Sequence, residues 1–225
     1  MTKPIRLMLV DDQAMVRAGF RMVLDAQSDM VVAAEATNGQ EALDRLRPDP
    51  GAIDLVLMDI RMPRLDGVAA TTEIMGFPSP PRVLVLTTFD LDEYVYAALR
   101  AGAAGFLLKD AGPEELLSAI RAVHGGDSVV APSATKRLLE AVLPSLPGAA
   151  DSDRDRLQAL TPREHEVLIA VGRGLSNSEI SAALFLAEPT VKTHIGRVLA
   201  KLGLRDRVQM VVLCYETGLV IPGDG

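Results

Sequence analysis

The fold of this chain is decided by residues 5–12, which read IRLMLVDD. A short, mostly apolar run of this kind is typical of a buried strand in a parallel sheet. Two aspartates, Asp11 and Asp12, follow the run directly. Open α/β sheets bind their ligands at the carboxyl ends of the strands. The stretch therefore predicts a central strand and also the edge of the sheet at which chemistry is to be sought.

Four further apolar runs alternate with helix-like stretches over the first 125 residues, and clusters of Gly, Pro and Asn separate them. Five βα repeats with right-handed crossovers predict a doubly wound α/β fold with helices on both faces of the sheet. The predicted strands are 5–10, 31–36, 53–59, 82–88 and 105–109. The predicted helices are 13–26, 39–47, 66–76, 91–102 and 113–124.

The strand pattern stops after residue 125, and the rest of the chain is organised differently. Residues 126–157 predict a linker with one helix at 132–143 and a polar, Pro/Gly-containing stretch at 144–155. Residues 158–225 predict an all-α domain of four helices. Thr161 and Ser176 each precede a glutamate by three residues, which is the pattern of a helix-capping box.

Composition limits the class of protein. The chain has 225 residues, a net charge of −7 and a single cysteine, Cys214, so a disulfide framework is excluded. No stretch approaches the roughly 20 apolar residues that span a bilayer. We expect a cytoplasmic protein that does not enter the membrane. The acidic excess lies in residues 1–125, whereas residues 158–225 are neutral and carry clustered Lys and Arg, which is compatible with binding phosphates.

Five polar residues lie at the predicted strand ends: Asp11, Asp12, Asp59, Thr87 and Lys109. In a parallel sheet all five reach the same edge. Crowded carboxylates raise one another's pKa unless a cation lies among them. Hard oxygen ligands at a partly hydrated site suit Mg²⁺. A hydroxyl and an ammonium group beside them are the groups that phosphoryl transfer to a carboxylate requires.

The motifs LVDDQ, VLMDIRMPRLDG, VLTTFD and GFLLKD resemble the receiver domains of two-component response regulators. The resemblance implies a five-stranded, flavodoxin-like sheet with strand order 2-1-3-4-5. It also implies that Asp59 is the phospho-acceptor and that a histidine kinase is the donor. It implies that Asp12 and Asp59 bind Mg²⁺ directly, Asp11 binds it through water, and the backbone carbonyl of Arg61 completes the protein ligands. Thr87 and Phe106 match the switch pair, Lys109 the phosphoryl-binding lysine, and Pro63 and Gly67 the loop after the acceptor.

Three alternatives bear on this interpretation. A dinucleotide site is disfavoured because no GxGxxG follows the first strand. A phosphatase of the haloacid-dehalogenase type requires DxDx[TV] there, whereas this chain has DDQAM, and such a hydrolase would turn over a small phosphate ester. A regulator independent of phosphorylation would lack part of the acidic set, which is complete here. We therefore expect a regulator and not an enzyme.

The stretches LTPREHEVL, GLSNSEISAALFLAEPTVKTHIGRVLAKLGL and DRVQMVVLCYETGLV resemble the helix-turn-helix domain of the NarL/FixJ (LuxR-type) regulators. Helix 177–184, turn 185–187 and helix 188–202 form the predicted DNA-reading unit, with the second helix in the major groove. We expect Lys192 and Thr193 to reach base edges, and Arg197 and Lys201 to bind phosphates. The full set of candidate DNA contacts is Ser176, Asn177, Thr190, Lys192, Thr193, His194, Arg197 and Lys201.

Two departures from the family pattern occur at the start of the recognition helix. Ala187 replaces the usual N-cap serine, and Pro189 stands where a small residue is common. The fourth helix, at 206–217, carries Val208, Val211, Val212 and Tyr215, which we expect to serve partly as core and partly as a dimer face. The expected protein is a transcription factor that dimerises when phosphorylated and binds double-stranded operator DNA, with RNA polymerase as a further partner.

Overall fold

The computed structural model of the chain describes residues 3–87, 92–125 and 156–220. The chain divides into two compact units near residue 129. Two predicted features lie outside the described residues, namely the helix at 132–143 and the linker at 144–155.

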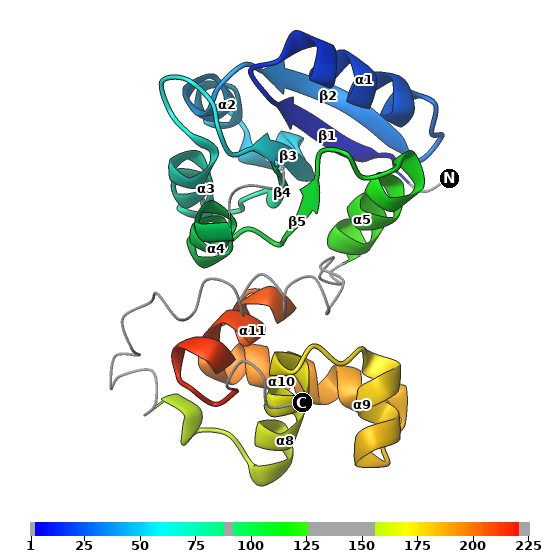
Figure 1. Cartoon of the computed structure of the whole chain (residues 1–225), viewed down its shortest axis with the longest axis vertical. Helices are drawn as coiled ribbons and strands as arrows, with labels where there is room; N and C mark the ends of the chain where they lie inside the picture. Colours follow the sequence, from blue (N-terminus) through cyan, green and yellow to red (C-terminus); the bar gives the residue numbers. More distant parts are fainter. Residues whose placement is uncertain (1–2, 88–91, 126–155, 221–225) are drawn as a thin grey trace. The chain divides into compact units, whose positions relative to one another are not determined.

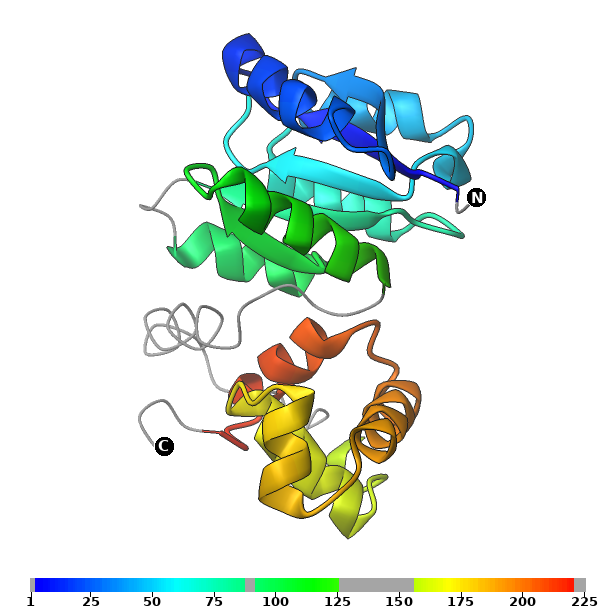
Figure 2. The ribbon, with the colours of Figure 1, turned by 90° about the vertical axis from the view of Figure 1, so that its right-hand side faces the viewer.

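The first unit contains a parallel sheet with the strand order β2-β1-β3-β4-β5, which confirms the prediction. Helices α1 and α5 cover one face of the sheet, and α2, α3 and α4 cover the other (Figures 1 and 2). The ends of the elements differ from the predicted ones by one or two residues. The strands are β1 (Ile5–Val10), β2 (Met30–Ala36), β3 (Leu55–Asp59), β4 (Arg82–Thr87) and β5 (Gly105–Leu108). The helices are α1 (Ala14–Asp25), α2 (Gly39–Leu46), α3 (Gly67–Met75), α4 (Asp92–Ala101) and α5 (Pro113–Gly125), with a 3₁₀ turn at Pro50–Ala52.

A hydrophobic core fills the space between the sheet and the helices α1 and α5. Leu7 and Leu9 of β1 and Leu55 and Leu57 of β3 belong to it and are at most 1% exposed. Burying a leucine side chain contributes about 1.5–3 kcal/mol to folding. Met8 and Val10 of β1 and Val56 and Met58 of β3 alternate with these leucines and are also buried. The two strands that end at the acidic residues are therefore fixed on both faces.

Asp54, which directly precedes β3, forms an ion pair with Arg6 of β1. Its carboxylate accepts hydrogen bonds from the Arg6 side chain at 2.6 and 3.0 Å and from the Arg6 amide at 2.8 Å. The Arg6 hydrogen bond lowers the pKa of Asp54, and burial opposes this only in part. The ion pair forms because β1 lies beside β3, which brings Arg6 within reach of Asp54.

Residues 156–220 form the second unit, which has the four helices that were predicted. Thr161 and Ser176 each complete a capping box with the glutamate three residues later, which confirms both predicted helix starts. Ala187 provides no side-chain cap for the third helix, and Gly203 ends it with φ +61°. None of the described helices has the length and apolar character required to cross a membrane. The helices are α8 (Pro162–Gly172), α9 (Asn177–Leu184), α10 (Glu188–Leu202) and α11 (Arg207–Glu216).

The apolar residues of α11 do not form an exposed face. Val208, Val211, Val212 and Tyr215 are all at most 7% exposed. The expectation that part of this set is a free dimer face is therefore not met at these positions. Instead α11 packs on α8, and the two helices approach each other closely at a glycine of α8.

Candidate functional site

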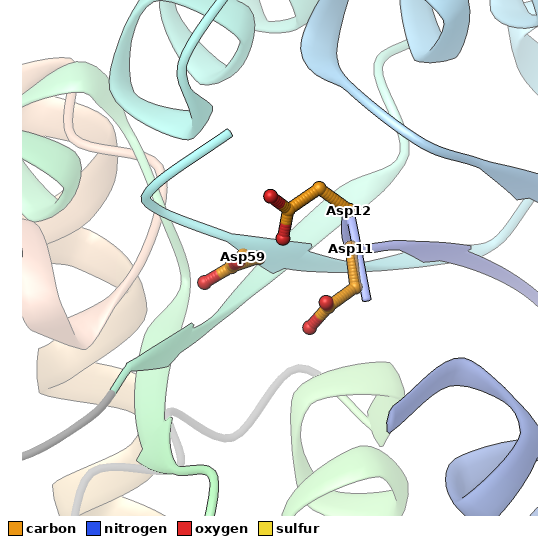
Figure 3. Close-up of side chains that lie close together, drawn as sticks. All are labelled: Asp11, Asp12 and Asp59. Atoms are coloured by element: carbon orange, nitrogen blue, oxygen red, sulfur yellow. The ribbon is translucent and has the colours of Figure 1, made fainter. Parts of the chain in front are cut away.

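Three carboxylates gather at the carboxyl ends of β1 and β3 (Figure 3). Asp11 and Asp12 follow β1, and Asp59 is the last residue of β3. One oxygen atom of each carboxylate lies within 4.8 Å of those of the other two. Asp11 and Asp59 are buried, whereas Asp12 is exposed. Solvent and solutes can therefore reach the cluster from the side of Asp12.

Lys109 is the cation that contacts this cluster. Its Nζ lies 2.8 Å from Asp11 Oδ2 and 2.9 Å from Asp59 Oδ2. Burial raises the pKa of Asp59, and the hydrogen bond from Lys109 only partly opposes this. Burial lowers the pKa of Lys109, but its bonds to Asp11 and Asp59 outweigh burial and the pKa is raised. One lysine leaves two of the three carboxylate charges unbalanced, and a divalent cation with a preference for oxygen ligands fits that charge and that donor set.

The loop after β3 fixes the backbone of Asp59. Gly67 begins α3, and its amide donates a hydrogen bond to the carbonyl of Ile60 at 2.9 Å. A Cβ at position 67 would lie 2.1 Å from the backbone oxygen of Asp59, which no real side chain tolerates. Asp66 caps α3 by accepting a hydrogen bond from the Ala69 amide at 2.8 Å. The loop therefore packs directly against the backbone of Asp59 and fixes the position of this residue.

Of the remaining predicted residues, Thr87 and Arg61 lie at the same edge of the sheet, whereas Phe106 lies within β5 and pairs with Val85 of β4. Thr87 ends β4 and is buried, and its carbonyl accepts a hydrogen bond from the Lys109 amide at 2.8 Å. Phe106 in β5 is buried, with 9% of its surface exposed. The side chain of Arg61 is exposed, and its guanidinium lies over the ring of Tyr94, 5.7 Å from the ring centroid.

Sequence reasoning missed two residues near the site. Arg17 in α1 donates a hydrogen bond to the backbone oxygen of Asp11 at 2.7 Å and so supports the end of β1. Its position one turn into the helix that follows Asp11 is a signal that could have indicated this. Tyr94 meets Arg61 across two different βα connections, and no spacing in the sequence indicates that contact.

The second candidate site is the outer face of α10. Lys192, Thr193 and Arg197 are exposed, whereas Val191 and Val198 of the same helix are buried. Lys192 and Arg197 make no ion pair within the described part of the chain. Their charges are therefore available to DNA.

Other candidate DNA contacts surround this face. Thr190 is exposed in the first turn of α10, and His194 is half-buried with no hydrogen-bond partner for Nδ1 in the described structure. Ser176 caps α9 through Glu179. The side-chain oxygen of Asn177 accepts a hydrogen bond from an arginine at the start of α11 at 3.0 Å. Ser176 and Asn177 thus already have partners within their own domain.

Lys201 differs from the other cations of α10 because it has a partner inside the domain. Its Nζ lies 2.6 Å from Oε2 of Glu164, which is buried, and 3.2 Å from the carbonyl of Ala159. A DNA phosphate would have to compete with Glu164 for this ammonium group.

Comparison with known proteins assigns a family to each of the two domains. Residues 7–121 match the family described as response regulator receiver domain. Residues 158–214 match the family described as bacterial regulatory proteins, luxR family. The chain therefore belongs to the response regulators with a receiver and a LuxR-type DNA-binding domain. It is a DNA-binding response regulator of a two-component system.

Similar proteins have the same organisation over nearly their whole length. The transcriptional regulatory protein YxjL of Bacillus subtilis is 41% identical, over 96% of this chain and 97% of that protein. The response regulator protein VraR of Staphylococcus aureus is 36% identical, over 96% and 99%. A crystal structure of the response regulator ChrA of a heme-sensing two-component system is 37% identical, covers 97% of this chain and all of that one, and has a TM-score of 0.54.

Proposed function

We propose that Asp59 is the residue through which this regulator is switched, by accepting a phosphoryl group from a histidine kinase. The main support for this proposal is the excess of negative charge at the site. Asp59 lies with two other carboxylates against a single lysine, and two negative charges remain unbalanced. Such a site is suited to a divalent cation and to the phosphoryl group that the cation would accompany.

Mg²⁺ is the cation that we propose for the site. Asp12 and Asp59 would bind it directly, Asp11 through water, and Arg61 through its backbone carbonyl. The exposure of Asp12 is consistent with a partly hydrated ion. When bound, the ion neutralises charge that otherwise opposes the approach of a phosphoryl group.

The transfer step uses the residues at the sheet edge. An Oδ atom of Asp59 forms a bond to phosphorus while the bond from phosphorus to the histidine nitrogen of the donor breaks, and the bonding electron pair leaves with that nitrogen. The Thr87 hydroxyl and the Lys109 ammonium bind the phosphoryl oxygens that carry the transferred charge. Phe106 would respond to the displacement of Thr87. We propose that the reaction modifies the protein and does not turn over a substrate.

The regulator acts by binding DNA, with α10 in the major groove. Lys192 and Thr193 lie in its N-terminal half, where base edges are reached, and Arg197 lies where a phosphate contact is expected. Ser176, Asn177, Thr190 and His194 border the same surface, and Lys201 is secondary because Glu164 holds it. We propose that phosphorylation favours a homodimer on a two-part operator in the cytoplasm, with RNA polymerase as the further partner.

The test compares wild type with Asp59→Asn, which keeps the shape of the side chain and removes the nucleophile. Both are incubated with Mg²⁺ and acetyl phosphate, and phosphoprotein is measured by intact mass. We expect one added phosphoryl group in wild type and none in the variant. Phosphorylation of the variant to the same extent would refute the assignment. Continuous release of phosphate in excess of protein from p-nitrophenyl phosphate would favour a hydrolase instead.

A further inference from the structure

Arg61 and Tyr94 form a contact between the loop after β3 and helix α4. Arg61 lies two residues after Asp59, in the loop between β3 and α3, and Tyr94 lies in the first turn of α4. The guanidinium carbon of Arg61 lies 5.7 Å from the centre of the Tyr94 ring, within the range of a cation–π interaction. The Tyr94 side chain is 46% exposed, so it is not part of the core.

Arg61 has the opposite charge to the acidic cluster, yet its guanidinium contacts an aromatic ring and not a carboxylate. Three carboxylates lie together at the end of β1 and of β3, and Lys109 balances only part of their charge. Coulombic attraction would draw a nearby guanidinium toward this cluster, because such attraction is strong where burial lowers the effective dielectric constant. In the structure Arg61 makes no ion pair among the described residues and lies on the Tyr94 ring instead.

We propose that Tyr94 is a positioning residue that holds Arg61 away from the acidic cluster and so keeps the cluster available to Mg²⁺. An arginine folded onto the carboxylates would neutralise charge that the ion needs and would obstruct its oxygen ligands. The contact also links the loop that carries the Arg61 carbonyl to α4. This inference rests on the proposed function, because it assumes that the cluster binds Mg²⁺.

The expected change in Mg²⁺ affinity follows from the strength of the cation–π interaction between Arg61 and Tyr94. A cation–π interaction at an exposed site corresponds to about a two- to five-fold change in an equilibrium constant. Removing the aromatic ring while keeping Arg61 should therefore weaken Mg²⁺ binding about two- to five-fold. The effect should require the charge of Arg61, because Arg61 is the group that would compete with the ion.

The experiment is a Mg²⁺ titration of the full chain, followed by NMR of backbone amides at the sheet edge. Tyr94→Leu removes the ring, Tyr94→Phe keeps it, and circular dichroism verifies that each variant is folded. We expect the dissociation constant to rise about two- to five-fold in Tyr94→Leu and to be unchanged in Tyr94→Phe. In an Arg61→Gln background, which retains the backbone carbonyl, Tyr94→Leu should have no further effect.

Three other results would contradict either the role of Tyr94 or the proposed Mg²⁺ site. Equal dissociation constants for wild type and Tyr94→Leu would overturn the inference. An equal loss of affinity in Tyr94→Leu with and without Arg61→Gln would also overturn it, because the ring would then act without Arg61. Absence of Mg²⁺ binding in wild type would refute the proposed metal site itself, which is a result distinct from the other two.

Discussion

Lys201 of the recognition helix donates a hydrogen bond to the buried carboxylate of Glu164 in α8, over a distance of 2.6 Å. The same carboxylate oxygen accepts a hydrogen bond from the Thr161 amide at 2.8 Å, which completes the capping box of α8. The C-terminal half of α10 is therefore tied to the first turn of α8. A residue that the sequence suggested for phosphate binding thus contributes to the geometry of the domain.

The first prediction separates Arg197 and Lys201, two of the cations of α10, by the salt dependence of DNA binding. Arg197→Ala should reduce the slope of log affinity against log salt by about one, because one phosphate contact is lost. Lys201→Ala should leave that slope unchanged and lower the melting temperature of the domain, because Glu164 loses its partner. DNA binding measured by fluorescence anisotropy at several salt concentrations, together with thermal melts, tests both. If the two substitutions reduced the slope equally, Lys201 would also be a phosphate contact and the prediction would be wrong.

The second prediction concerns pH and the same ion pair. The hydrogen bond from Lys201, together with that from the Thr161 amide, lowers the pKa of Glu164 from its ordinary 4.5 to about 2. A lowered pKa contributes stability above the unfolded value, and this stability is lost as pH falls from about 4.5 toward 2. Glu164→Gln should therefore melt at a lower temperature than wild type at neutral pH, and the difference should shrink as pH approaches 2. A difference that stays constant over this range would contradict the assigned charge interaction.

The third prediction uses two glycines of the receiver as a matched pair. Gly67→Ala should destabilise the domain by about 1–3 kcal/mol or more, because the new methyl group collides with the Asp59 backbone. It should also slow phosphorylation by acetyl phosphate, because the acceptor is displaced. Gly19→Ala in α1 meets no atom within 4 Å and should stabilise by about 0.5–1 kcal/mol. Chemical denaturation measures both, and a neutral Gly67→Ala would show that the loop relaxes freely.

The fourth prediction tests whether Lys192 reads a base. Lys192→Ala should weaken specific binding by about 1–3 kcal/mol and relax the preference at one base pair of the operator. Operators selected from random sequence with wild type and with the variant should then differ at one position in each half-site. Weaker binding with an unchanged sequence preference would make Lys192 a phosphate contact.

Much of the receiver could be predicted from sequence because its pattern is local. A run such as 5–10 cannot be solvated without exposing apolar surface, so its burial in a parallel sheet follows from composition. The βα alternation then limits the topology, and the strand order 2-1-3-4-5 was confirmed. Since strand ends in such a sheet share an edge, Asp11, Asp12 and Asp59 could be placed together before any coordinates were known.

The sequence by itself therefore determined the two kinds of domain, the strand order, the helix caps at Thr161 and Ser176, and the acidic edge, because each depends on local pattern and on chain topology. Only the tertiary structure decided which charges are free. Arg6 with Asp54, Lys201 with Glu164 and Arg61 with Tyr94 are pairs from separate elements, and their distances depend on how those elements pack. The same is true of Gly67, whose missing side chain matters only because the loop returns onto Asp59.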